Sequence, residues 1–587
     1  MKIQELAIPQ ADICDELKLY FNGDNFSITD NTIVIDANGN VDTDTYFNSF
    51  SIRKWMKYTE LKNLTLTIDV EGECSIYLCY AWIDKTNIIR RAGDNKPAFI
   101  KESSARESLT LTYPDNSEGT IAYYRIASKN GSVRIYAAGY SSDLSIINDV
   151  KVALGICTYK REDFVYKNIA SLKSSILDNA SSTLYGKVKV IISDNGCSLD
   201  KTQISDKDIT CVDNLNLGGS GGFTRCMIEA KKLMVSDNIT HIILMDDDIV
   251  FDPQTIERTY TLLSLLKPQY YSNAMIGGAM LILNDMPKQF ENAALYHGGM
   301  LKFENKNIDL RTIRNVLTNE RPKDVNYNAW CYCCMPLSVI TDDNLPMPFF
   351  IHMDDVEYGV RNKFEVITMN GINVWHPFFQ NQRPASIVYY DVRNKLITMA
   401  ELGGMHIERY ASFYLEMFHN YIFNYDYNRT ILACQAILDF CKGIDAFKTA
   451  DALELQSRLS GYNQPWFDDD DGSVLAGIDN SESVNYVSKK GLLINYLLPA
   501  KKESITVDCS INNAYPYRAK QLIVCNRRQN KYCVYKKSLV KLVQAKHMCN
   551  KAKKAIRTTI LDSSWEWHDR IGEITNIDYW KNYLKIN

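Results

Sequence analysis

The sequence of 587 residues lacks any long apolar run. No stretch approaches the roughly 18 consecutive apolar residues that a membrane-spanning helix needs. The first residues also lack a basic segment followed by an apolar one, so we expect no secretory signal and a cytoplasmic protein. A large net charge is missing as well. The 66 Lys and Arg nearly balance the 70 Asp and Glu, so the whole chain is no polycation built for nucleic acid.

The cysteines lack the pattern of a disulfide framework. There are 16 of them, scattered along the chain, and several fall inside apolar runs typical of strands. The one dense group, Cys331, Cys333 and Cys334, has no partner pair of Cys or His at zinc spacing. We therefore expect reduced, buried thiols.

One hydrophobic core stops growing at about 250–300 residues, so a chain of this length predicts several domains. The first of these, residues 1–150, is predicted to be a β-sandwich. In this first region, short runs rich in β-branched and aromatic residues alternate with turn signals. The runs are 64–69, 75–83, 108–113, 120–127 and 132–139. Acceptor binding and simple packing are both open as roles for this domain.

Residues 151–400 predict an α/β domain with a doubly wound sheet. The runs VALGIC (152–157), KVIIS (189–193) and HIILM (241–245) are short and continuously apolar. Such runs are typical of strands buried on both faces of a parallel sheet, and helix-like segments separate them. Because ligands bind at the carboxyl ends of strands in these sheets, the loops after the runs are the places to search for chemistry.

Residues 401–587 predict a mainly helical region. Residues 410–423 and 430–441 carry apolar residues at helical spacing. From residue 509 to 561 there are 13 Lys or Arg and no Asp or Glu. Residues 536–560 predict a basic amphipathic helix, which suits an anionic membrane surface. A nucleic-acid surface and an ordinary solvated face are the alternatives.

The strongest local signal is Asp246-Asp247-Asp248, directly after HIILM. Three neighbouring carboxylates repel one another, and a cation relieves that repulsion. Along an extended chain Asp246 and Asp248 point to one side and Asp247 to the other, a geometry suited to one Mg²⁺ or Mn²⁺. The alternative is a solvated strand end.

A glycine-rich segment, NLNLGGSGGFTR (214–225), is the second signal. Glycines let the backbone approach a ligand closely, and the segment then enters a helix whose first amides favour phosphate. It matches neither the Walker pattern nor the dinucleotide fingerprint, so ATPases and dehydrogenases lose support. A flexible loop without a ligand is the alternative.

Two further groups carry titratable side chains. Asp354, Asp355 and Glu357 follow an apolar run. A carboxylate beside another is a candidate general base, because repulsion raises one pKa, although acids also occur at helix N-termini for stability alone. His376, in NVWHPFF (373–379), is either structural or a metal ligand. Only its combination with the Asp triplet favours the ligand.

These pieces occur in the order TYKR, ISDNG, NLGGSGGFTR, LMDDDI, YNAW, FFIHMDDVEYG, WH and YYDVRNKL. In this combination the chain resembles the bacterial galactofuranosyltransferases that build cell-wall galactan, members of the inverting glycosyltransferase family 2. The resemblance is close over about residues 150–400 and looser in both flanks. It implies a Rossmann-like GT-A glycosyltransferase core (151–400) between an N-terminal β-sandwich (1–150) and a C-terminal helical region (401–587).

The resemblance also implies roles for single residues. The metal ligands are Asp246, Asp248 and His376, and the metal is Mn²⁺ or Mg²⁺. The donor-binding residues are Arg161, Asp194, Asn216, Gly218, Gly219, Asp246 and Asp247. The general base is Asp355, and the acceptor-binding residues are Asp354, Glu357 and Trp330.

Two departures from the family pattern indicate a changed acceptor. Trp330 matches the first of two adjacent tryptophans at the sugar site, and Cys331 stands where the second would be. Gly298 and Gly299 occupy a region where the family can carry an acid that contacts the acceptor.

The implied activity is transfer of galactofuranose from UDP-galactofuranose to a hydroxyl of a bacterial surface glycan, free or lipid-linked. The implied location is peripheral, on the inner face of the cell membrane, through residues 509–561. Nucleic acid is not an expected partner, and a homo-oligomer is compatible with the resemblance. The rivals are a transferase for another UDP-hexose, a metal-dependent nucleotidyltransferase, and a glycan-binding protein with an inactive core.

Overall fold

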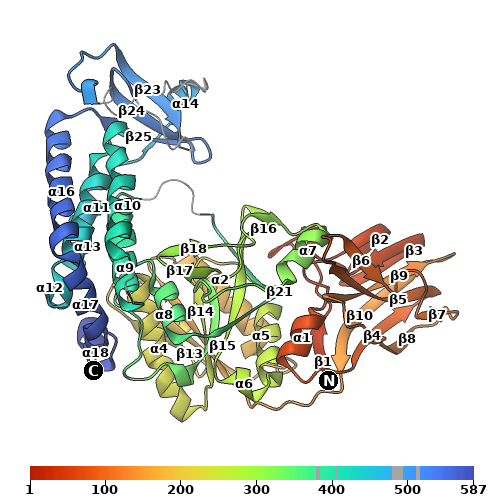
Figure 1. Cartoon of the computed structure of the whole chain (residues 1–587). Helices are drawn as coiled ribbons and strands as arrows, with labels where there is room; N and C mark the ends of the chain where they lie inside the picture. Colours follow the sequence, from red (N-terminus) through yellow and green to blue (C-terminus); the bar gives the residue numbers. More distant parts are fainter. Residues whose placement is uncertain (379–383, 404–405, 479–492, 510–515, 587) are drawn as a thin grey trace.

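The computed structural model describes residues 1–586 except 379–383, 404–405, 479–492 and 510–515. Three parts lie side by side (Figure 1). A β-rich N-terminal domain flanks a central α/β domain. A group of long C-terminal helices, topped by a small sheet, flanks it on the other side.

Ten strands form the N-terminal domain, and all five predicted runs are among them. Strand β3 pairs with β10 through residues 33–35 and with β9 through residues 40–42. Strand β3 therefore joins the group β6-β5-β9 to the group β10-β4-β8 in one hydrogen-bonded network. The elements are β1 (Lys2–Glu5), β2 (Asn22–Thr29), β3 (Thr32–Asp42), α1 (Ile52–Tyr58), β4 (Leu64–Glu71), β5 (Cys74–Ile83), β6 (Ile89–Ala92), β7 (Phe99–Lys101), β8 (Glu107–Thr112), β9 (Ile121–Ser128) and β10 (Val133–Ser142).

The central domain contains a nine-stranded mixed sheet in the order β13-β12-β11-β14-β20-β15-β16-β19, with β21 paired to β15. The first four strands are parallel, as the continuous apolar runs of β11, β12 and β14 predict. The strands are β11 (Val152–Thr158), β12 (Val188–Asp194), β13 (Ile209–Asp213), β14 (His241–Asp246), β15 (Ala274–Ile282), β16 (Asp285–Glu291), β19 (Ile308–Asp309), β20 (Tyr332–Pro336) and β21 (Glu365–His376).

Helices and a separate hairpin complete the central part. The helices are α2 (Glu162–Leu172), α3 (Lys201–Ile204), α4 (Gly218–Ser236), α5 (Gln254–Leu265), α6 (Pro268–Tyr271), α7 (Ile313–Glu320) and α8 (Asp354–Asn362). Helix α9 (Ile387–Glu401) follows and packs against the C-terminal helices (Figure 1). The hairpin is β17 (Leu295–His297) and β18 (Met300–Lys302). The three clustered cysteines, Cys331, Cys333 and Cys334, are buried thiols at or beside β20.

Helices dominate the C-terminal part, but a four-stranded sheet that the helical prediction missed also lies there. The helices are α10 (Ile407–His419), α11 (Tyr427–Phe440), α12 (Gly443–Thr449), α13 (Ala452–Ser460), α14 (Ser473–Ala476), α16 (Leu539–Thr558), α17 (Ile560–Arg570) and α18 (Ile577–Leu584). The strands are β22 (Phe467–Asp468), β23 (Lys502–Asp508), β24 (Ala519–Asn526) and β25 (Lys531–Lys536). The basic segment thus divides between this sheet and helix α16.

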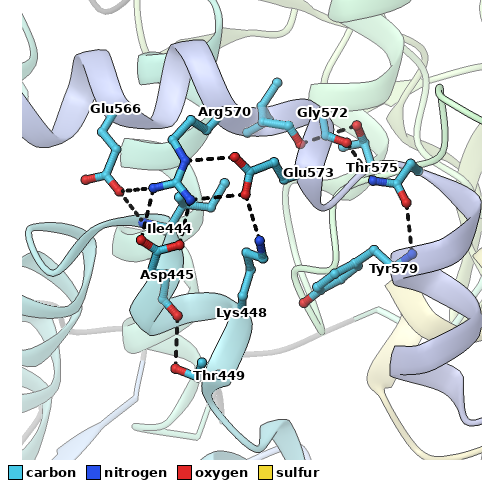
Figure 2. A network of polar contacts seen from close by, with 12 residues as sticks. Ile444, Asp445, Lys448, Thr449, Glu566, Arg570, Gly572, Glu573, Thr575 and Tyr579 are labelled. Carbon is cyan, nitrogen blue, oxygen red and sulfur yellow. Dashed lines mark hydrogen bonds and ion pairs between the residues drawn. The ribbon is translucent and has the colours of Figure 1, made fainter.

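Polar contacts hold the last helices together. Arg570, at the end of α17, bonds Asp445 of α12 at 2.6 Å and Glu573 at 2.8 Å (Figure 2). The C-terminal part also contacts the central domain, since the Trp580 indole donates to the Pro346 carbonyl at 2.8 Å. In the part of the chain that is described, no helix is both long and apolar enough to cross a bilayer.

Candidate active site

The metal-binding residues predicted from the sequence meet at one edge of the central sheet. Strand β14 ends at Asp246, and residues 247 and 248 form a turn. The chain then pairs with the end of β21: the backbone amides of Val250 and Trp375 each donate to the other's carbonyl at 2.8 Å. This bridge brings the triplet next to His376, the last residue of β21.

Asp246, Asp248 and His376 form a compact cluster. The Nε2 atom of His376 is 3.1 Å from Asp248 Oδ1 and 3.5 Å from Asp246 Oδ2. One ligand atom from each residue lies within 4.8 Å of the other two. The Nδ1 atom of His376 contacts the Pro377 carbonyl at 2.7 Å, which turns Nε2 toward the carboxylates. Two carboxylates and one imidazole suit a divalent cation, and they leave coordination positions for water or phosphate.

Electrostatics at the cluster favour positive charge. Burial lowers the pKa of His376, but its hydrogen bonds with Asp246 and Asp248 outweigh burial and raise that pKa to about 10. Arg161, at the start of α2, pairs with Asp247 at 3.0 Å and also with Asp248. Arg161 and His376 thus compensate the negative charge of the triplet.

Two other residues predicted to bind the donor support nearby loops. Asp194, the last residue of β12, is fully buried and accepts hydrogen bonds from the amides of Gly196, Ser198 and Leu199 at 2.7–2.9 Å. The Asn216 side chain accepts from the Gly218 amide at 3.3 Å. Asp194 therefore shapes the loop after β12, at the same edge of the sheet as the acid cluster.

The glycine-rich segment enters helix α4 as predicted: residues 214–217 precede the helix, and the four glycines lie in its first turns, from Gly218 onward. Gly218 has φ +70°, and a Cβ there would lie 1.9 Å from the Phe350 carbonyl oxygen. A Cβ at Gly222 would lie 2.1 Å from the sulfur of Cys157. Any side chain at Gly218 or Gly222 would therefore clash, whereas a Cβ at Gly219 would meet nothing closer than 4.0 Å. The glycines let the start of α4 pack against strand β11 and the loop before α8.

The acid pair stands at the start of helix α8. Asp354 accepts a hydrogen bond from the Ser220 hydroxyl of α4 at 2.8 Å. Burial is the main factor that raises the pKa of Asp355 well above its ordinary range, and the charges of Asp354, Glu291 and Asp246 raise it further. Asp355 is thus electrostatically coupled to the acid cluster, which is the environment of a candidate general base.

The loop that presents this pair has an unusual backbone. Phe350, His352 and Met353 all have positive φ, at 73°, 66° and 75°. Non-glycine residues in this region cost of order 1–3 kcal/mol each and persist only when their surroundings impose them. The loop is defined here as the base loop, residues 349–353.

Helix α9 holds the base loop in place. The fully buried Asn394 amide donates to the carbonyls of Phe349, Ile351 and His352 at 3.2, 2.9 and 3.0 Å. One turn earlier, Asp391 contacts the His352 ring at 2.7 Å. These residues were not among the predicted site residues, although YYDVRNKL was among the motifs of the resemblance.

Glu291, at the end of β16, is a further residue that was not predicted from the sequence. Its pKa is raised by burial, and the charge of His376 partly opposes that shift. A narrow cavity beside it is also lined by Tyr327 and Cys331. No local motif surrounds Glu291, so its position follows only from the pairing of β16 with β15.

The remaining acceptor-side residues predicted from the sequence, Glu357 and Trp330, are both buried. Glu357 is fully buried and pairs with Arg361. Trp330 is 3% exposed and packs edge-on against Phe223 and Tyr358. Gly298 and Gly299 form the turn between β17 and β18 beside Tyr410.

Known proteins resemble this chain over most of its length. A family model described as "Galactofuranosyltransferase 2 N-terminal" matches residues 12–143. The galactofuranosyltransferase GlfT2 of Mycolicibacterium smegmatis is 25% identical over 493 residues, which cover 79% of this chain and 72% of that protein. This is a galactofuranosyltransferase-like protein. The predicted resemblance is therefore confirmed, and the comparisons support the predicted glycosyltransferase.

GlfT2 of Mycobacterium tuberculosis is 24% identical over 413 residues, which cover 63% of this chain and 60% of that protein. Among solved structures, the mannosyltransferase PcManGT from Pyrobaculum calidifontis, in complex with GDP-Man and Mn²⁺, covers 55% of this chain and 87% of its own, with 9% identity and a TM-score of 0.29.

Proposed function

We propose that this protein transfers galactofuranose from UDP-galactofuranose to a hydroxyl of a bacterial surface glycan, with inversion at the anomeric carbon. The observation that carries the proposal is the arrangement of one site. The Asp246, Asp248 and His376 cluster lies near enough to Asp355 for the charge of Asp246 to raise the pKa of Asp355. We therefore assign the candidate cation site and the candidate base to one reaction centre.

The donor side handles negative charge. A divalent cation bound by Asp246, Asp248 and His376 would supply Lewis-acid stabilisation of the leaving diphosphate. Arg161, which is 43% exposed at its side chain, can exchange an aspartate partner for a phosphate oxygen. The first turn of α4 offers backbone amides whose dipoles also favour phosphate.

The acceptor side handles a proton. Asp355 is raised in pKa toward the working range of a general base, so it can take the proton of an attacking hydroxyl. Attack on the face opposite the leaving UDP inverts the anomeric carbon in one step. Asp354, fixed by Ser220, keeps a second negative charge beside the base, and Glu291 offers an acceptor for other sugar hydroxyls.

The deciding experiment incubates the protein with UDP-galactofuranose, Mn²⁺ and synthetic or lipid-linked glycan acceptors, and reads the products by mass. Parallel reactions contain UDP-galactopyranose and UDP-glucose. Galactofuranose addition that depends on the cation supports the proposal. Transfer of another hexose instead identifies the first rival, and pyrophosphate release from a nucleoside triphosphate identifies the nucleotidyltransferase.

We also propose peripheral contact with an anionic membrane through the first turns of α16. Leu539, Val540 and Val543 are 57%, 68% and 60% exposed, and Lys541 lies among them on the surface. Apolar side chains beside basic ones are the pattern of an interfacial helix. Cosedimentation with phosphatidylglycerol vesicles should fall in Val540→Asp. Equal sedimentation of the variant, or equal binding to phosphatidylcholine vesicles, would contradict this contact.

A further inference from the structure

A row of polar side chains crosses the open face of the N-terminal domain. Tyr77 of β5 is paired with Arg125 of β9, Arg125 with Asp42 of β3, and Asp42 with Asn22 of β2. Side chains at directly opposed positions of neighbouring strands lie on the same face. The four residues therefore form one continuous row over four strands, at positions that the catalytic proposal does not use.

This row lines a groove. A hollow of about 470 Å³ is bordered by Tyr77, Arg125, Asp42, Asn40 and Asp94. A second hollow of about 360 Å³ shares Asp42 and Arg125 with the first. Because two of the lining residues are common, the hollows adjoin, and together they are called the N-terminal groove.

The N-terminal groove leads to the central domain. Its second hollow is also bordered by Arg311 and Thr312, directly before α7. Just upstream, Ile308 of β19 pairs with Gln289 of β16, two residues before Glu291 of the candidate active site. A short stretch of one sheet edge thus connects the inner end of the groove with the acceptor side of the site.

The lining chemistry identifies the class of ligand. Arg125 pairs with Asp42 at 2.8 Å, and Arg91 pairs with Asp44 at 2.9 Å, so charges of both signs are present and largely compensated. Such a surface favours neither a polyanion nor a polycation. Fixed carboxylates and guanidinium groups accept from and donate to neighbouring hydroxyls, and the half-buried Tyr77 ring offers an amphipathic face.

We propose that the N-terminal groove binds a neutral oligosaccharide, as the distal segment of the glycan whose end is extended at Asp355. That this oligosaccharide is part of the acceptor rests on the proposed function, whereas oligosaccharide binding by the groove is independent of that function. The groove would add affinity for long acceptors by holding sugars remote from the reacting hydroxyl, without changing the chemical step.

The test uses the full chain in EDTA without donor, so that no transfer occurs. Calorimetry measures binding of galactofuranosyl, galactopyranosyl and glucosyl hexasaccharides and of a galactofuranosyl disaccharide. The variants are Tyr77→Ala and Asp94→Ala, which leave the Arg125–Asp42 pair intact. Tyr136→Ala, a half-buried tyrosine of β10 outside the groove, is the matched control, and thermal unfolding verifies that each variant is folded.

We expect both groove variants to bind a hexasaccharide about tenfold more weakly than the wild type and the Tyr136→Ala control. With donor and Mn²⁺ present, KM for the hexasaccharide acceptor should rise while its kcat and the kinetics of the disaccharide stay unchanged. The proposal that the groove binds an oligosaccharide would be overturned by either of two results. Both groove variants could bind the hexasaccharides as tightly as the wild type does, or the wild type could bind no hexasaccharide more tightly than the disaccharide.

The two proposals fail in different ways. If the wild type transfers no galactofuranose but binds one of the hexasaccharides through Tyr77, the groove is supported and the proposed function is wrong. If transfer proceeds but the groove variants treat long and short acceptors as the wild type does, the proposed function stands and the groove is wrong.

Discussion

The two sides of the candidate site are built in different ways. The donor-side residues Asp194, Asp246 and His376 come from the ends of regular strands, β12, β14 and β21, which the sheet itself aligns. The acids of the acceptor side follow the base loop, whose left-handed backbone is held by hydrogen bonds from α9. The donor side is therefore a consequence of the sheet, while the acceptor side needs support from a helix that lies later in the chain.

The largest expected effect is on the donor side. Asp248→Ala removes a carboxylate that contacts both His376 and Arg161. Because a cation is expected to stabilise the leaving group by several kcal/mol, cation-dependent transfer should fall by at least about 10³-fold. Titration with Mn²⁺ should show lost binding in parallel. Wild-type turnover of the variant in Mn²⁺ would remove Asp248 from the metal site.

The second-largest effect is expected from removal of the candidate base on the acceptor side. Asp355→Ala should lower kcat by about 10²–10⁴-fold, because general-base catalysis contributes that much. Binding of UDP, measured by calorimetry with Mn²⁺, should stay near that of the wild type. If UDP binding falls as far as kcat does, Asp355 belongs to the donor side and the distinction between the two sides fails.

A smaller loss of kcat is expected when the hydrogen bonds from α9 to the base loop are removed. Asn394→Ala takes away the donors to three base-loop carbonyls, and we expect kcat to fall about 10–10²-fold because misplacement by about 1 Å is enough for this. Mn²⁺ binding should be unchanged. Thr398→Val, at an equally buried position of α9, is the matched control. A parallel loss of Mn²⁺ binding would mean that Asn394 supports the whole domain.

The smallest effect is a shift in pH dependence. The base acts only when deprotonated, so kcat/KM should rise with pH through the raised pKa of Asp355. Burial is the main cause of that raised pKa, and the charge of Asp354 adds to it. Asp354→Asn removes the charge, lowers this pKa and should move the acidic limb of the kcat/KM profile to lower pH. The exposed Asp343→Asn is the control, and a limb that stays or moves upward contradicts the assignment.

Three strands of the central sheet could be predicted because their signals are local. Continuous apolar runs identified β11, β12 and β14, and acids directly after a buried run pointed to the metal cluster. The basic helix was also correctly predicted, since its buried positions Leu542, Ala545, Cys549 and Ala552 follow helical spacing. In each case neighbours in the sequence supply the whole pattern.

Other features could not be read from local patterns. The glycines of α4 resemble a ligand-binding loop, but two of them are required by contacts with Phe350 and Cys157, far away in the sequence. The sequence groups Glu357 with the acids of the site, but in the structure its side chain is fully buried and pairs with Arg361. The C-terminal sheet was missed because two of its four strands, β24 and β25, lie within a segment noted only for its charge.

The sequence by itself determined the buried strands, the residue types that can bind a cation and the succession of motifs, because these depend on neighbouring residues and on local periodicity. Only the tertiary structure decided that His376 faces Asp248, that Asn394 supports the base loop and that Glu291 joins the acceptor side. These contacts join residues tens to more than a hundred positions apart, so they are fixed by strand pairing and helix packing and not by any local pattern.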